Sequence, residues 1–291
     1  MERKAILLTT VLLFCTGGLT QAQALFEATE DDIGITAEVT YASRYIWRGF
    51  DSYMENHSAI QPEVNFDLFG TGWTFDVWVS RANGSGFEEY EEWQFALAYA
   101  GAPLWSDMSY STNWQAGYRY YYFPDGPMRP MPGASTLNLD REEVFMNVSW
   151  PSISQTGIVP SFSVFYIWPA ESDVRSNGTA WSAFRKSRGF GYVFGLDYDW
   201  TVPGLIEGIP EQIIHLSSDL YYNQGFGISP LPRMNHPDED WSHVLLGATT
   251  DFDLGSGFSV SPGVWFQKSM DDSVNTSDEY YFTVRGQYKT R

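Results

Sequence analysis

Apolar and polar side chains alternate along most of the chain with a period of two residues. Ile35, Ala37 and Val39 are apolar, while Thr36 and Glu38 between them are polar. This period places successive side chains on opposite faces of a β-strand. The segments with this pattern are 35–47, 60–68, 73–79, 93–99, 114–122, 144–150, 162–168, 190–200, 214–222, 244–252, 258–266 and 280–288. The sequence therefore predicts about twelve strands, each with an apolar and a polar face.

The connections between these segments alternate in length. The short ones are 70–72, 101–110, 151–159, 201–210 and 255–257. The longer polar ones are 48–57, 81–89, 124–141, 169–188, 224–240 and 268–278. An even number of strands, with short turns on one side and long loops on the other, is typical of bacterial outer-membrane barrels. We therefore predict an all-β fold over residues 35–291, a closed antiparallel up-and-down transmembrane β-barrel of about 12 strands.

The apolar faces carry aromatic residues at both ends and aliphatic residues, such as Val64, Leu97 and Val164, between them. Amphipathic rings favour the two headgroup levels of a membrane, so this order is typical of a barrel surrounded by lipid. Aromatic residues make up 17% of the chain, whereas no stretch after residue 24 has the length of an apolar membrane helix. The expected lipid-facing girdle residues are Tyr45, Trp47, Trp73, Trp93, Trp114, Trp150, Trp168, Trp200 and Tyr288.

The first residues have the features of an export signal. Arg3 and Lys4 precede an apolar run, and small residues at Ala22 and Ala24 favour cleavage before Leu25. We predict a signal peptide over residues 1–24, followed by a short periplasmic segment over 25–34. Cleavage would remove Cys15, the single cysteine, so no disulfide is expected in the exported chain.

The polar faces of the predicted strands line the lumen of the barrel. Their expected charged residues are Glu38, Arg44, Glu63, Asp67, Asp76, Glu92, Arg119, Glu143, Asp197, Asp219, Asp251 and Arg285. Isolated charges in a dry interior are costly, and acids outnumber bases too heavily for complete pairing. A water-filled path is therefore predicted; the alternative is a closed barrel filled by an ion-pair network.

The excess of acidic over basic residues restricts which molecules can bind this chain. A formal net charge of −19 repels nucleic acid and attracts cations. Acidic runs at 88–92 and 238–240 are usual for solvated surfaces, with divalent-cation binding as the alternative. Because no phosphate-binding loop, paired-cysteine site or HExxH motif is present, we predict neither a cofactor nor a metal site.

An enzymatic alternative rests on His215, Ser217 and His243, which share the polar face of neighbouring predicted strands. Some outer-membrane barrels are lipid hydrolases that use serine and histidine. These three residues would point into the lumen, where the ester of a membrane lipid does not arrive. We therefore expect no enzymatic activity.

The run from Thr40 to Phe50, which reads TYASRYIWRGF, resembles the opening of the TorF-like porin family. The resemblance is most evident over residues 35–100. It implies a bacterial outer-membrane barrel with a transport role, and it brings no catalytic residues to carry over.

Together these patterns predict an outer-membrane porin for small solutes. Twelve strands lie between the filled interior of small barrels and the wide channel of large ones, so the path is expected to be narrow. The acidic wall predicts a mild preference for cations. The expected partners are outer-membrane lipid, lipopolysaccharide, the barrel-assembly machinery and a small solute of unknown identity. The alternatives are a non-conducting structural barrel and an outer-membrane lipid hydrolase.

Overall fold

The computed structural model describes residues 33–53, 57–84, 91–124, 140–170, 188–204, 211–227 and 237–290. The predicted signal peptide, residues 25–32 of the predicted periplasmic segment, and residues 88–90 of the first acidic run lie outside these ranges. Within the described ranges, no helix is long and apolar enough to cross a membrane.

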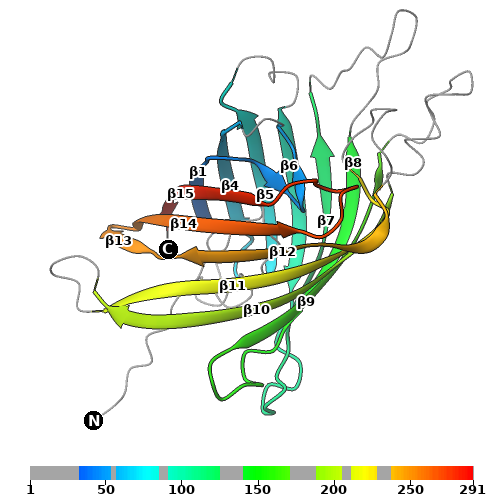
Figure 1. Ribbon diagram of the computed structural model, residues 1–291. Coiled ribbons are helices and arrows are strands. Elements are labelled where there is room, and N and C mark those ends of the chain that lie inside the picture. Colours follow the sequence, from blue (N-terminus) through cyan, green and yellow to red (C-terminus); the bar gives the residue numbers. More distant parts are fainter. Residues whose placement is uncertain are drawn as a thin grey trace, which may run out of the picture.

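Antiparallel strands close into one barrel, as predicted (Figure 1). The strands are β1 (Gly34–Ala42), β4 (Ala59–Asp67), β5 (Trp73–Ala82), β6 (Glu92–Ala100), β7 (Asn113–Tyr122), β8 (Arg141–Ser149), β9 (Val159–Pro169), β10 (Gly189–Pro203), β11 (Glu211–Gln224), β12 (Glu239–Thr249), β14 (Phe258–Ser269) and β15 (Glu279–Lys289). The short strand β13 (Phe252–Gly255) follows β12 and pairs with β14. Because β1 pairs with β15, with Tyr41 opposite Val284, the wall has 12 strands and no open edge.

Short turns lie at one end of the barrel and longer connections at the other. The half of the interior near the short turns is called the turn half here, and the opposite half the loop half. Gly72 shows how tight a turn is: its φ is 86°, and an added Cβ would lie 2.3 Å from the carbonyl oxygen of Ala100. Only glycine fits there without displacing the neighbouring strand.

The alternation along each strand divides the wall into an outer and an inner face. On the outer face, Leu97 is 43% exposed and Val264 61% exposed. On the inner face, Trp265 is 4% exposed and Glu143 is fully buried. The apolar side chains that are exposed or half-buried on the outer face form the surface that a membrane-spanning barrel offers to lipid.

The first strand is shorter than predicted. The alternating pattern was expected to continue from Ile35 to Trp47, but β1 ends at Ala42. The chain leaves the wall at Ser43, whose amide donates to the carbonyl of Phe282 at 2.9 Å. The next residues form a separate two-stranded hairpin of β2 (Ile46–Trp47) and β3 (Phe50–Asp51). Side chains alternate in an isolated hairpin as they do in a wall strand, so the period of two does not distinguish the hairpin from a continuation of β1.

A β-bulge explains the irregular phase of the segment around Leu245. Tyr221 pairs with His243 and Tyr222 with Trp241, which leaves Ser242 as the extra residue in β12. A bulge shifts the alternation by one position. Ser242 and His243 are consequently both buried, and Leu245 lies on the inner face at 3% exposure.

Candidate functional site

The hairpin of β2 and β3 lies inside the barrel. Its turn residues Arg48 and Gly49 have φ values of 49° and 95°, which is the type I′ geometry favoured by the twist of two-residue hairpins. Gly49 meets the opposite wall closely, because an added Cβ would lie 2.6 Å from His243 Nδ1. The residues from 43 to 53 are called the inward hairpin below.

The inward hairpin contributes four large aromatic side chains to the interior. Tyr45, Trp47, Phe50 and Tyr53 are 1%, 5%, 6% and 2% exposed. Trp47 and Phe50 both pack on Phe226, with ring centroids at 6.1 and 6.0 Å. Burial of this much aromatic surface supplies the driving force that holds the hairpin in the lumen.

Tyr45 and Trp47 therefore correct the sequence prediction. Both were expected in the lipid-facing girdle, and that prediction was wrong. Tyr45 packs on Trp78 of β5 with ring centroids 5.7 Å apart, and Trp47 packs perpendicular to Tyr121 of β7 with ring centroids 5.8 Å apart. The cause is the departure of the chain from the wall at Ser43, which turns both rings inward.

Polar contacts join the inward hairpin to strands around the ring. Tyr45 Oη donates to Glu92 Oε2 at 3.0 Å, and Tyr53 Oη donates to Ser80 Oγ at 2.9 Å. Gln267 Nε2, on β14, donates to the carbonyl of Gly49 at 2.9 Å. Arg44 forms an ion pair with Glu279 of β15. The hairpin thus spans the loop half of the lumen, with partners on opposite sides.

Arg48, at the tip of the inward hairpin, contacts the wall at β8 and β9. Its two terminal nitrogens lie 2.6 and 3.0 Å from the two carboxylate oxygens of Glu143. Its guanidinium carbon lies 3.5 Å from the ring centroid of Phe165 and 4.8 Å from that of Trp47. Burial alone would lower the pKa of Arg48, but the Glu143 carboxylate raises that pKa above its ordinary value.

Glu143 is also held by its own wall. Arg119 Nη1, on β7, lies 3.2 Å from Glu143 Oε1, and Tyr121 Oη donates to Glu143 Oε2 at 2.9 Å. Arg119, Glu143 and Glu92 were all expected to line the lumen, and all three lie on the inner face at the level of the hairpin. There they contact protein groups, so side chains link the hairpin to the wall and narrow the lumen at this level.

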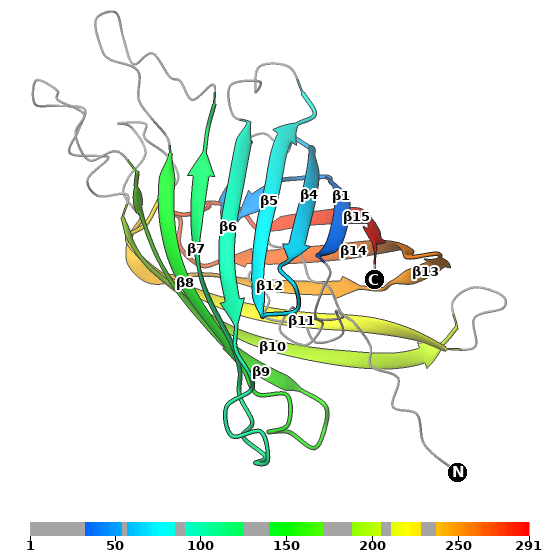
Figure 2. The same cartoon turned by 180° about the vertical axis from the view of Figure 1, so that it is seen from behind.

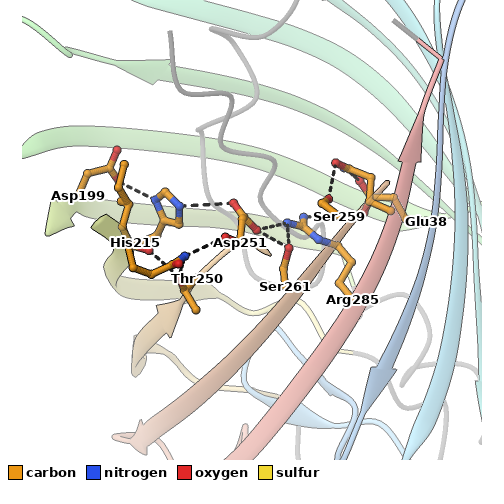
Figure 3. A network of polar contacts seen from close by, with 11 residues as sticks. Glu38, Asp199, His215, Thr250, Asp251, Ser259, Ser261 and Arg285 are labelled. Carbon is orange, nitrogen blue, oxygen red and sulfur yellow. Dashed lines mark hydrogen bonds and ion pairs between the residues drawn. The ribbon is translucent and has the colours of Figure 1, made fainter. Parts of the chain in front are cut away.

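The turn half has a different set of contacts, shown in Figure 3. His215 Nδ1 lies 2.7 Å from Asp199 Oδ1, and its Nε2 lies 3.4 Å from Asp251 Oδ2. Arg285 Nη2 lies 3.3 Å from Asp251 Oδ1, and Arg285 Nη1 lies 3.9 Å from Glu38 Oε2. This polar chain crosses from β10 to β1 along the inner face. The sequence predicted that Arg285, Asp251 and Glu38 lie on the inner face. It did not predict that Arg285 pairs with the other two.

Besides Glu92, which accepts hydrogen bonds from Tyr45 and Gln94, four other carboxylates on the inner face form no ion pair within the described part of the chain. They are Glu63 and Asp76 on β4 and β5, and Asp197 and Asp219 on β10 and β11. Asp76 Oδ1 is buried and has no hydrogen-bond partner among the described residues. The remaining expected lumen residue, Asp67, accepts from the amide of Gly70 at 3.1 Å and so belongs to the turn.

The other expected girdle residues are Trp73, Trp93, Trp114, Trp150, Trp168, Trp200 and Tyr288, which are exposed or half-buried. At the turn end, Trp73 packs on Tyr99 at 5.1 Å and Tyr99 on Trp114 at 5.7 Å. At the loop end, Tyr166 packs on Trp168 at 5.5 Å. Their contact with lipid stays a prediction.

The residues of the enzymatic alternative are not brought together. His215 contacts Asp199 and Asp251, while His243 stacks on Tyr221 at 4.1 Å and lies 2.9 Å from Ser242 Oγ. No hydrogen bond joins Ser217 to either histidine in the described part of the chain. A nucleophilic serine needs such a base within hydrogen-bond reach, so this arrangement does not favour a hydrolase.

No family model matches this chain, and no curated protein matches it. Several solved structures are similar at low identity. The NanC porin is 11% identical with a TM-score of 0.47, over 87% of this chain and 98% of that chain. The KdgM porin in complex with disordered oligogalacturonate is 6% identical with a TM-score of 0.45, over 88% and 98%. An outer membrane channel from Pseudomonas putida F1 is 8% identical with a TM-score of 0.45, over 90% and 98%.

Proposed function

We propose that this chain is a channel of the bacterial outer membrane, through which small solutes pass passively. The supporting observation is the combination of a closed barrel with an inner face that carries four unpaired carboxylates. Buried carboxyl groups without a cationic partner keep their charge only where water or cations reach them. The inward hairpin occupies the loop half, so the conducting path is narrow.

A mild cation preference follows from where the unpaired acids lie. In the ring of strands, β4 and β5 lie opposite β10 and β11, on the two walls shown in Figure 1 and Figure 2. Glu63 and Asp76 therefore face Asp197 and Asp219 across the lumen. Opposed carboxylates in a low-dielectric wall focus a negative potential, which selects for positive ions.

Strand register supports a common level for the two acidic pairs. Hydrogen-bonded partners lead from Asp76 through Ala96, Arg119, Glu143 and Ile167 to Gly189 on β10. The strands are tilted by about 40°, so ladder partners on distant strands do not lie at the same height in the barrel. Over five strand spacings of about 4.8 Å, the residue at equal height is about six residues away from the ladder partner. Counting from Gly189 toward the turn end reaches the neighbourhood of Asp197, which is therefore near the level of Asp76.

Membership of the TorF-like porin family is part of this proposal. The run that carries the resemblance, Thr40 to Phe50, includes most of the inward hairpin. Outer-membrane lipid, lipopolysaccharide and the barrel-assembly machinery remain the proposed partners. The exposed apolar outer face and its aromatic ends support contact with lipid.

A non-conducting structural barrel is the second candidate, favoured by the aromatic packing of the inward hairpin. Single-channel recording of the refolded protein in a planar bilayer distinguishes the two. The channel predicts stepwise openings in KCl, with a reversal potential that favours potassium over chloride. A protein that inserts without any conductance would support the structural barrel, and cleavage of the bilayer phospholipid would support a hydrolase.

A further inference from the structure

The tip of the inward hairpin places an arginine where turn geometry favours other residues. Arg48 takes the first position of a type I′ turn at φ 49°, a position that favours asparagine, aspartate or glycine. A residue with a longer side chain is strained in this left-handed region. Such strain persists where the surrounding structure compensates for it, so contacts of the Arg48 side chain must hold the turn in this conformation.

Those partners are part of the barrel wall. Glu143 on β8 offers both carboxylate oxygens, at 2.6 and 3.0 Å from the two guanidinium nitrogens. Phe165 on β9 offers the face of its ring at 3.5 Å. Arg119 and Tyr121, both on β7, fix the Glu143 carboxylate through contacts of 3.2 and 2.9 Å. These four residues are called the wall receptor below, and none of them belongs to the inward hairpin.

A carboxylate with both oxygens available, next to the face of an aromatic ring, is the arrangement that recognises a guanidinium group. The carboxylate accepts two parallel hydrogen bonds from the planar guanidinium, and the face of the ring attracts the delocalised positive charge of the guanidinium. An ammonium group is a compact point charge that cannot make both contacts in the same way. Glu143 is fully buried and already oriented, so little reorganisation is needed for a ligand to bind.

We propose that the wall receptor is a binding site for a guanidinium-bearing solute, and that Arg48 fills it as a tethered ligand. This proposal rests on the proposed function, because the solute reaches the site through the channel. A free guanidinium group and Arg48 compete for the same carboxylate. Solute binding therefore favours the state in which the tip of the inward hairpin has left the wall.

The test uses Arg48→Gly, which empties the wall receptor and relieves the strain at the turn. Methylguanidinium chloride at millimolar concentration is the probe, and methylammonium chloride at equal concentration is the control. Because a ligand that binds the folded state stabilises it, the melting temperature of Arg48→Gly should rise with methylguanidinium and saturate. The unmodified protein, whose site is filled, should show a much smaller rise.

The double variant Arg48→Gly with Glu143→Gln identifies the site. It should show no rise in melting temperature with methylguanidinium, since the carboxylate is absent. An equal rise in the single and double variants, or no rise in the single variant, would overturn the proposal. If Arg48→Gly does not refold, Arg48→Asn replaces it, because asparagine also tolerates left-handed φ.

Conductance separates this proposal from the proposed function. If methylguanidinium raises the melting temperature of Arg48→Gly in the predicted manner while no variant conducts, the wall receptor stands and the channel fails. If the variants conduct but the melting temperature does not respond, the channel stands and the wall receptor fails.

Discussion

In the loop half of the barrel, the rings of Trp47 and Phe50 pack on Phe226, with centroids 6.1 and 6.0 Å from the Phe226 centroid. In the turn half, His215 and Arg285 instead share Asp251 through contacts of 3.4 and 3.3 Å. The wall alternates in the same way in both halves. They differ because a connecting segment fills one of them and leaves the other to the side chains of the wall.

This difference has a physical consequence for charge. In the loop half, Glu143 has Arg48 and Arg119 as partners, so its negative charge is neutralised by protein. In the turn half, Glu63 and Asp219 form no ion pair in the described part of the chain, although they are only 7% and 5% exposed. Where the carboxyl groups of Glu63 and Asp219 are ionised, cations from solution therefore balance their charge, whereas protein groups balance the charge of Glu143.

Glu143→Gln should give the largest effect, because it removes the buried carboxylate that pairs with both Arg48 and Arg119. Removing one partner of a buried ion pair costs about 3–5 kcal/mol of the free energy of unfolding. Urea-induced unfolding in lipid vesicles measures the change. The matched control is Glu142→Gln on the same strand, half-buried on the outer face, which should change the free energy little. Equal losses in the two variants would show that the loop half is not held by this ion pair.

Val264→Arg should be the next largest effect. Its side chain is 61% exposed on the outer face, and arginine at the middle of a lipid-facing strand costs about 2–4 kcal/mol. Asn65→Arg, on the inner face of β4, is the control and should cost less, because a long charged side chain is accommodated in a wet lumen. Folding titrations of both variants in vesicles provide the measurement. Equal tolerance would contradict the assignment of the outer face to lipid.

The acidic pairs should give the smallest effect, on ion selectivity. Changing Glu63, Asp76, Asp197 and Asp219 to their amides should move the reversal potential in a KCl gradient toward zero. Glu92→Gln is the control from the loop half; its carboxylate is held by Tyr45, so the reversal potential should stay unchanged. A preference for anions in the unmodified protein would show that Arg119 and Arg285 dominate the path.

The sequence was sufficient to predict the strands of the barrel wall, but it was insufficient to predict the hairpin that fills part of the lumen. Alternation predicted the number of strands, the closed barrel and the face of residues such as Glu63 and Val264, since a period of two is a property of the backbone. It could not distinguish the end of β1 from the hairpin that follows, because both alternate. One signal was available: Arg48 and Gly49 sit between the aromatic residues Trp47 and Phe50, and a glycine at this position favours a two-residue turn.

Pairing within the interior was beyond the reach of the sequence for another reason. Glu143 and Arg48 are far apart in the chain, and their contact depends on the depth to which the inward hairpin enters the lumen. The contact between His215 and Asp199 depends on the register of β10 and β11. The bulge at Ser242 changes the phase of β12 by one residue, which a periodic pattern does not predict.

The central claim is that the inward hairpin narrows a conducting barrel, and its removal tests that claim most directly. Residues Ile46 to Asp51 are replaced by a short glycine and serine linker, and single-channel conductance in KCl is compared with that of the unmodified protein. Because the aromatic groups that cross the loop half are then absent, conductance should rise severalfold while the preference for cations is kept. A stable, inserted variant whose conductance equals that of the unmodified protein would contradict the claim.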